Sequence, residues 1–376
     1  MAADERLYIK ANNKGVWTED NYIMSLKDFM FVTENYIADY LKAILFCNCK
    51  WGTCTYDDIP QNTNTCEGIM ALILAHQTEN YADVIQKGII YLTGEVKNAG
   101  LVSKSLGIET VVPTAMYLYI CKKSDKKDLI KKAEKIAYEL WSVKSELGWG
   151  LYVRNMFGYA NVGCTYWAVM GLEQYSNISE SEFQLYLSSL FKYNGTYCFG
   201  QTINDVNPQI PCLYSTAMMY IIYMHLTKEY KKIIGKRYNR EKAIAYIVKH
   251  FDNPFFLVEQ EGIDGVEMEG KTSVHTVNWS HLTIHYSLRA IALAIENREI
   301  DEEMIREIIV RIYAVLEKYS GRSDGRLYWS APNMTLERGK RGKIIFPTMH
   351  VLIGISYVRD TINHLIQCLE ECEIKV

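Results

Sequence analysis

The stretch GWGLY (148–152), followed by GCTYWAVMGL (163–172), decides the fold of this chain. It places a glycine and an aromatic residue in a loop, and then a threonine in the first turn of an almost entirely apolar helix. The same unit recurs six times, which indicates a repeat architecture. The six apolar helices are expected near residues 64–77, 113–122, 163–175, 215–226, 281–296 and 346–358. The repeat threonines are Thr65, Thr114, Thr165, Thr216, Thr283 and Thr348.

Each apolar helix follows an amphipathic one, such as DKKDLIKKAEKIAYEL (125–140). A helix that is apolar all round must be buried, whereas its amphipathic partner faces water, so the hairpins predict two layers. We therefore expect an all-α fold, a single α/α-toroid domain over residues 1–376 in which six hairpins form an α6/α6 barrel with a central cavity. An open superhelical solenoid is the alternative. No run of alternating residues predicts a sheet, and Ser179 and Asp301 are expected to cap two amphipathic helices.

Composition limits the class of protein further. Hydrophobic residues make up 49% of the 376 residues, and 41 basic residues face 44 acidic ones, so the chain resembles neither a disordered protein nor a non-specific nucleic-acid binder. No apolar run reaches the length of about 18 residues that a membrane span needs, and MAADERLYIK at the start lacks the core of a signal peptide. We expect a cytoplasmic protein with reduced cysteines. Zinc held by the densest cysteine group is the alternative, but the group lacks paired C-x-x-C spacing; it comprises Cys47, Cys49, Cys54 and Cys66.

The glycine–aromatic loop GWGLY (148–152) and the helix GCTYWAVMGL (163–172) resemble the repeats of squalene/hopene-type terpenoid cyclases and protein prenyltransferase β subunits. The resemblance extends over residues 21–358. It implies a toroid of six helical hairpins with the active site in the central cavity. Because prenyltransferase β subunits work with a helical partner, it also implies a partner subunit.

The motifs that carry this family's chemistry are absent. Class II cyclases protonate an alkene with a D-x-D-D motif before the inner-helix threonine, but CLYS (212–215) stands before Thr216 and has no carboxylate. Prenyltransferases bind Zn²⁺ through Asp, Cys and His; Cys164 matches the cysteine, whereas Val162 and Ser215 occupy the other two positions. The resemblance thus predicts the fold and a ligand-binding cavity, with a mechanism that is either non-standard or lost.

Three titratable residues share one position in the repeat. Glu67, His285 and His350 each lie two residues after a repeat threonine, and their helices are consecutive neighbours in a closed ring. We therefore expect the three side chains to converge at one depth. They can hold a zinc or iron ion, with His281 as a further ligand, or act without metal as an acid/base relay. A polar corner of the core, where each residue bonds a neighbouring helix, is the alternative.

The same position is apolar in the other helices of the ring. Met116, Trp167 and Met218 would form a wall suited to an apolar or isoprenoid-like ligand, because aromatic faces also stabilise carbocations. Cys164 and Ser215, three residues nearer the helix starts, are expected to line the same pocket. Simple filling of the barrel centre is the alternative.

Two kinds of charged segment complete the candidates. Arg289 follows its repeat threonine by six residues, and Arg338 and Arg341 lie in the loop ERGKRGK (337–343); these three are expected to meet an anion such as a phosphate. The acidic loop VEQEGIDGVEMEG (258–270) is expected to be a solvated insertion, and the alternative is that it supplies metal ligands or glycosidase-like paired carboxylates. The basic segment KEYKKIIGKRYNREK (228–242) is expected outside the ring as a partner-binding segment.

Two functions are compatible with these features. One is an enzyme, or former enzyme, that binds an apolar ligand, with or without a phosphate, in the central cavity. The other is a non-catalytic interaction or regulatory scaffold, which the missing motifs favour. A centre packed by Trp167 and the methionines supports the scaffold, and a cavity of several hundred Å³ supports the enzyme.

Overall fold

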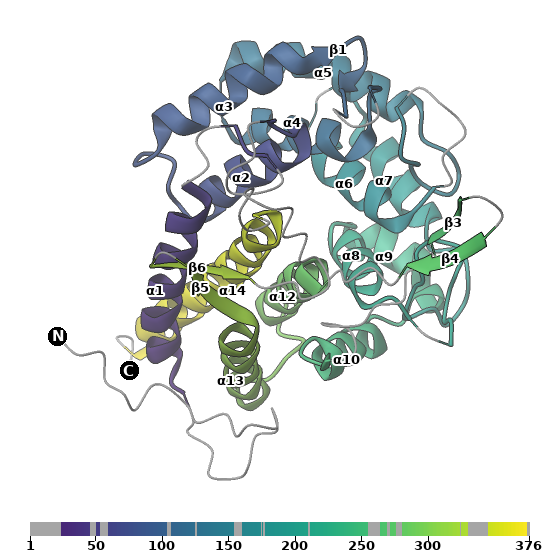
Figure 1. The fold of residues 1–376 in the computed structure, drawn as a ribbon. Helices are drawn as coiled ribbons and strands as arrows, with labels where there is room; N and C mark the ends of the chain where they lie inside the picture. The colour runs from purple at the N-terminus through teal and green to yellow at the C-terminus, as the bar shows by residue number, and fades with distance from the viewer. Residues whose placement is uncertain are drawn as a thin grey trace.

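Six apolar helices form the inner ring of the protein, as a computed structural model shows (Figure 1). Each contacts the next along the chain and the last contacts the first, so the ring is closed and is not an open solenoid. The inner helices are α2 (Asn62–Leu74), α4 (Val111–Lys123), α6 (Val162–Leu172), α8 (Leu213–Met224), α12 (Ser280–Glu296) and α14 (Phe346–Glu373). The structure describes residues 24–45, 50–52, 59–103, 107–124, 126–153, 160–173, 175, 177–209, 211–254, 264–268, 271–275, 280–323, 325–329 and 345–373.

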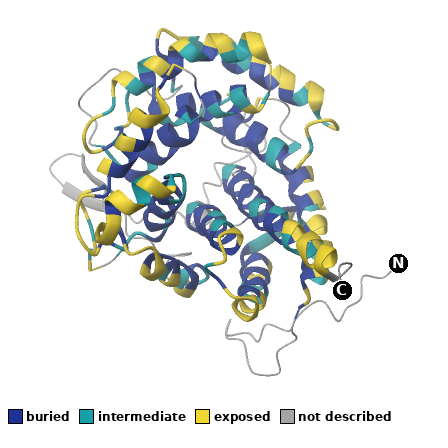
Figure 2. Cartoon of the chain, turned by 180° about the vertical axis from the view of Figure 1, so that it is seen from behind, coloured by how far each residue is buried: buried dark blue, intermediate teal, exposed yellow. Residues whose placement is uncertain are grey.

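An outer layer of amphipathic helices surrounds this ring. Figure 2 shows the inner helices almost uniformly buried, apart from the C-terminal end of α14, whereas the outer helices expose one face. The outer helices are α1 (Leu26–Leu45), α3 (Ala82–Glu95), α5 (Lys127–Ser142), α7 (Glu180–Ser189), α9 (Lys228–Ile234), α10 (Arg240–His250) and α13 (Glu302–Tyr319). A 3-10 turn, η2 (Gly235–Arg237), joins α9 to α10. None of the helices in the described part of the chain combines the length and the apolar character that a membrane span requires.

The repeat threonine has a structural role that explains its recurrence. Both partners of this contact are described in five of the six repeats. In each of these five, the threonine Oγ1 accepts a hydrogen bond from a backbone N–H group in the loop before the inner helix. The donors are Trp51, Leu101, Trp149, Phe199 and Trp329, at N–O distances of 3.2, 2.9, 3.0, 3.0 and 3.1 Å. In these five repeats the threonine therefore fastens the loop to its inner helix and satisfies a backbone N–H group.

The loop glycines serve two separate purposes. A Cβ atom on Gly100 or Gly148 would lie 2.3 or 2.0 Å from the Oγ1 of the repeat threonine, so these positions need glycine for close approach. Gly148, Gly195 and Gly325 adopt φ angles of +104°, +72° and +70°, which favour glycine for conformational reasons, so Gly148 is needed on both counts. In the sequence, both kinds of glycine fall at the same place in the repeat, so they look like a single motif.

Small antiparallel hairpins lie in the connections of this all-α fold. They are β1 (Val96–Lys97) with β2 (Gly100–Leu101), β3 (Asp264–Met268) with β4 (Lys271–His275), and β5 (Ser320–Ser323) with β6 (Arg326–Trp329). These hairpins join outer helices to inner helices. Each hairpin has only two short strands, so the sequence has no alternating pattern that would predict them.

The helix boundaries follow local chemistry. Ser179 and Asp301 cap α7 and α13 by accepting from the backbone N–H of Glu182 and Met304, as the sequence predicts. Helix α14 differs from the expectation, because it continues to Glu373 instead of ending near residue 358. Residues 359–373 contain neither glycine nor proline, the usual stop signals, so nothing ends the helix sooner.

Candidate functional site

A hydrogen-bonded chain of three side chains joins the first, fifth and sixth inner helices. Glu67 of α2 binds His350 of α14, with 3.0 Å between Oε1 and Nε2. His350 in turn binds His285 of α12, with 2.7 Å between their Nδ1 atoms. All three are buried, with exposed fractions of 5%, 3% and 0%. The structure thus brings together the three residues that share the repeat position, and we call them the Glu67–His350–His285 chain.

The bond pattern fixes the proton positions when Glu67 is ionised and both histidines are neutral. The carboxylate can only accept hydrogen bonds, so His350 carries its proton on Nε2, and its unprotonated Nδ1 offers a lone pair. That lone pair accepts from His285, whose proton is therefore on Nδ1 and whose Nε2 is the basic nitrogen. A proton taken up by His285 can pass to His350 and rest beside Glu67, which is the arrangement of an acid/base relay.

The described geometry fits a metal ion less well. His350 uses both ring nitrogens inside the chain, so the three groups form a line instead of converging on one point. Among the described residues, no set of three His, Cys, Asp or Glu side chains is placed to hold a metal. The side chain of His281, together with Cys47, Cys49 and Cys54, lies outside the described residues. The zinc or iron site remains a prediction.

The zinc set of the prenyltransferases also fails to fit the residues in place. Cys164 begins the apolar helix α6, and burial raises the pKa of its thiol to about 11. Val162 is an apolar residue of the same helix, and Ser215 offers a buried hydroxyl that has no hydrogen-bond partner among the described residues. A neutral thiol with these neighbours lacks the ligands of a catalytic zinc centre.

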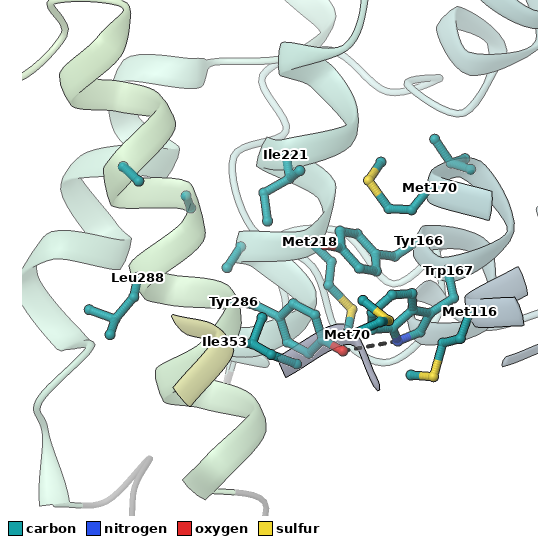
Figure 3. Close-up of a cluster of buried hydrophobic side chains, with 14 of the residues drawn as sticks. Met70, Met116, Tyr166, Trp167, Met170, Met218, Ile221, Tyr286, Leu288 and Ile353 are labelled. Carbon is teal, nitrogen blue, oxygen red and sulfur yellow. Dashed lines mark hydrogen bonds between the residues drawn. The ribbon is translucent and has the colours of Figure 1, made fainter. Parts of the chain in front are cut away.

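Aromatic side chains lie against the histidines. The ring of His285 stacks on Tyr286, with 4.2 Å between centroids, and Trp167 Nε1 donates to the Tyr286 hydroxyl at 3.0 Å. Figure 3 shows this bond and the surrounding methionines. Burial raises the pKa of the Tyr286 phenol well above its usual value, so the hydroxyl stays protonated. The side chains of α6 and α12 thus meet inside the ring.

The predicted apolar wall is present and tightly enclosed. Trp167, Met116 and Met218 are exposed by only 4%, 1% and 2%, and Cys164 and Ser215 are also buried. Sequence reasoning missed a second layer of this cluster, which Figure 3 labels. Its members each lie five residues after a repeat threonine, a periodic signal that could have found them; they are Met70, Met170, Ile221, Leu288 and Ile353.

Arg289 lies one helical turn beyond His285 on α12. Its Nη1 donates to the Tyr166 hydroxyl, and its Nη2 lies 3.2 Å from the sulfur of Met170. The guanidinium also sits over the ring of Tyr357, 4.7 Å from the centroid. The sequence identified the arginine but not the tyrosines around it. Arg338 and Arg341, the other predicted anion ligands, lie outside the described residues.

Comparison with known proteins identifies the architecture. No family model matches the chain, and no curated protein matches its sequence. Among solved structures, the GH76A α-1,6-mannanase of Salegentibacter sp. HEL1_6 is similar, with a TM-score of 0.59 and 10% identity over 89% of this chain and 100% of that chain. The fold is an α/α toroid.

The type II terpene cyclase MstE from Scytonema shares this toroid. Its complex with merosterolic acid A, the product, gives a TM-score of 0.56 and 13% identity over 90% of this chain and 100% of that chain. A variant complex with geranylgeranyl dihydroxybenzoate, the substrate, matches equally well, over 89% and 99% of the two chains. The two similar enzymes act on a polysaccharide and on an isoprenoid, so the toroid alone does not determine the chemistry.

Proposed function

We propose that this toroid is an acid/base enzyme that binds an apolar, isoprenoid-like ligand at the centre of its inner ring, by a route unlike that of the standard cyclases. The observation that carries the proposal is the Glu67–His350–His285 chain. Three titratable side chains are buried together, and an aromatic and methionine-rich surface begins beside them. Titratable side chains that are buried together in an apolar interior are common at catalytic sites.

The chemistry of this chain sets the reaction class. An imidazole relay removes or delivers protons at groups whose pKa lies near neutrality, and it is too weak an acid to protonate an isolated alkene. We therefore assign proton transfer at a polar group of the bound ligand, a step in which the histidines give or take the proton and no carbocation has to form. Methionine side chains are flexible, so Met116 and Met218 can move to admit an apolar molecule beside Trp167.

A scaffold is the second candidate, and the packing of the centre favours it. Trp167, Met116 and Met218 are almost fully buried, and the bond from Trp167 to Tyr286 ties two inner helices together. In that case the Glu67–His350–His285 chain only joins helices across the ring. A protein partner subunit and a cytoplasmic location remain predictions that suit either function.

The test compares relay variants with a matched histidine variant. Glu67→Gln, His285→Gln and His350→Gln are incubated in D₂O with geranylgeraniol and geranylgeranyl diphosphate, and mass spectrometry detects products and incorporated deuterium. His225→Gln is the control, because His225 also binds a carboxylate, Glu173, at 2.7 Å but lies outside the relay.

We expect turnover by the wild type and by His225→Gln, and a loss of about a hundredfold or more in the relay variants, the size usual for a general acid/base. Ligand binding and thermal stability, measured on the same samples, show whether each variant is folded. Equal turnover in all variants contradicts the proposal. So does the absence of any binding or turnover by the folded wild type, a result that supports the scaffold.

A further inference from the structure

The C-terminal end of α14 carries a run of side chains that commonly bind metal ions. Asp360, His364, Cys368 and Cys372 follow one another at intervals of four residues, which places them along one side of the helix. Between residues 360 and 369 no other His, Cys, Asp or Glu occurs in the sequence. These residue types are therefore gathered on a single side, and we call His364, Cys368 and Cys372 the α14 stripe.

The α14 stripe lies on the surface of the protein. His364, Cys368 and Cys372 are all exposed, and Figure 2 shows the end of α14 as an exposed segment. Glu370 comes two residues after Cys368, which places it on the opposite side of the helix, and it pairs with Lys27 at 2.7 Å, just before α1. That opposite side faces α1, so the stripe faces solvent.

Exposure is uncommon for a cysteine, which proteins mostly bury as a small apolar side chain. The other cysteines in the described part of the chain are buried or half-buried, and burial raises the pKa of each thiol; they are Cys66, Cys121, Cys164, Cys198 and Cys212. Packing explains why those residues are cysteines. It does not explain Cys368 and Cys372, whose side chains lie outside the core, and chemical reactivity is the usual alternative reason.

His364 and Cys368 are close enough to share one ion. The Sγ atom of Cys368 lies 3.9 Å from both Nδ1 and Nε2 of His364. In a tetrahedral zinc site, with Zn–S of about 2.3 Å and Zn–N of about 2.0–2.1 Å, the sulfur and the nitrogen are about 3.5 Å apart. Both side chains are exposed and therefore able to move, so a small rotation of the imidazole brings the pair to this geometry.

We propose that His364 and Cys368 bind a divalent cation that favours nitrogen and sulfur ligands, such as Zn²⁺, on the surface of α14. Cys368 binds as the thiolate and releases its proton to solvent, and His364 binds through a neutral imidazole nitrogen. No third His, Cys, Asp or Glu among the described residues completes the set. Two positions of a tetrahedral ion are then left for water or for a ligand from another molecule, so the bound ion can exchange.

The neighbouring groups restrict the site to this pair. Oδ1 of Asp360 lies 3.0 Å from Nε2 of His76 and 2.6 Å from Nη2 of Arg359, so this carboxylate already has partners of its own. Cys372 is eight residues beyond His364, or about 12 Å along the helix axis, which is too far for both to bind one ion.

The site is also separate from the Glu67–His350–His285 chain. His350 precedes His364 on α14 by 14 residues, which is about 21 Å along the axis. The side chains of the relay are buried, whereas those of the pair are exposed. The metal site therefore does not depend on the proposed function, and either can fail without the other.

The experiment compares two exposed cysteines within one molecule. Reduced protein without an affinity tag is treated with iodoacetamide in the presence and absence of Zn²⁺, and peptide mass spectrometry measures the alkylation rates of Cys368 and Cys372 separately. The same measurement is made on His364→Gln and on His76→Gln. His76 is the matched control, because it is an exposed histidine that contacts α14 through Asp360 and lies outside the pair.

We expect Zn²⁺ to slow the alkylation of Cys368 by about tenfold or more and to leave that of Cys372 unchanged, because only a thiolate bound to the metal is protected. His364→Gln should remove the protection, and His76→Gln should retain it. Equal protection of both cysteines overturns the proposal, as does protection that persists in His364→Gln. The absence of protection at about 0.1 mM Zn²⁺, a concentration that fills a site of micromolar affinity, also overturns it.

A second measurement detects the metal–sulfur bond directly. Co²⁺ alone is titrated into the wild type, Cys368→Ser and Cys372→Ser, and the absorption band of a cobalt–thiolate bond is followed. This band should fall in Cys368→Ser and keep its wild-type strength in Cys372→Ser. An equal fall in both variants assigns the metal to the two cysteines and contradicts the role of His364. Circular dichroism of every variant should match the wild type, because the substituted side chains are exposed.

Discussion

Gly100→Ala tests the close contact between a loop glycine and a repeat threonine, which the second and third repeats share. Gly100 is in the hairpin before α4, and its φ lies outside the left-handed region, so the backbone itself accepts alanine. The added Cβ would lie 2.3 Å from Oγ1 and 2.8 Å from Cγ2 of Thr114. Rotating the Thr114 side chain away from the new Cβ would break two hydrogen bonds, because Oγ1 donates to Thr110 O at 2.6 Å and accepts from Leu101 N at 2.9 Å.

The expected cost follows from these contacts. Overpacking a rigid site costs about 1–3 kcal/mol, and losing the bond to Leu101 adds about 1 kcal/mol, so we expect about 3 kcal/mol for Gly100→Ala. Thr114→Ala removes the same bond and should cost about 2 kcal/mol. In the double variant the contacts with Oγ1 and Cγ2 are gone and only the contact of 3.1 Å with Cβ of residue 114 remains, so its cost should exceed that of Thr114→Ala by less than about 1 kcal/mol. The resulting coupling of about 2–3 kcal/mol is large for a pair in contact.

The assay is urea unfolding followed by circular dichroism, with midpoints compared at unchanged slope. Gly94→Ala is the matched control, since a Cβ at that position in α3 meets nothing within 4 Å. It should stabilise the protein by about 0.5–1 kcal/mol, because glycine disfavours a helix interior. Additive costs in the double variant, or a cost of Gly100→Ala below about 0.5 kcal/mol, refute the reasoning.

Three further predictions concern side chains near the ring centre. Burial raises the pKa of Glu173, but the bond and charge of His225 together with the charges of Arg289 and Lys123 lower it by more, so the net pKa is depressed. Glu173→Gln should therefore cost about 1 kcal/mol near neutral pH, and thermal unfolding at several pH values should show this cost vanish as acid protonates the carboxyl below its usual pKa. Trp167→Phe leaves the Tyr286 hydroxyl without its donor and should cost about 1–3 kcal/mol in the same assay. Cys164, with its pKa raised to about 11, should resist iodoacetamide at neutral pH while the exposed cysteines of α14 react, as read by peptide mass spectrometry.

The fold was predictable from sequence because one physical requirement repeats. Every inner helix has a threonine in its first turn, and in the five repeats where the loop partner is described this threonine binds its own loop, so the spacing of threonines indicates the number and order of hairpins. The short hairpins were not predictable. Strands of two to five residues bury too few side chains to leave an alternating pattern, and Gly100 is needed there because of Thr114, a contact that only the fold creates.

The candidate site was predictable to the extent that it follows helix periodicity. One repeat position placed Glu67, His285 and His350 together, since equal depth on neighbouring helices brings side chains into contact. The same logic could not supply Tyr166 or Tyr357 beside Arg289. They lie at other offsets from the repeat threonine, and their meeting depends on how α6 and α14 rotate about their axes. The roles of all these residues remain predictions.

The Glu67–His350–His285 chain places polar groups where the last repeat meets the first and closes the ring, and its effect on stability can be measured. Glu67 and His350 are 283 positions apart and join the first repeat to the last. Breaking the chain by Glu67→Leu should cost about 3–5 kcal/mol, because His350 keeps a buried donor without its partner. Replacing all three residues by leucine should cost far less, since well-packed apolar side chains often match a buried polar network in stability. If urea unfolding shows this recovery, stability does not account for the chain, and a chemical role does. If the triple variant is as unstable as the sum of its single variants, the chain is there to close the ring.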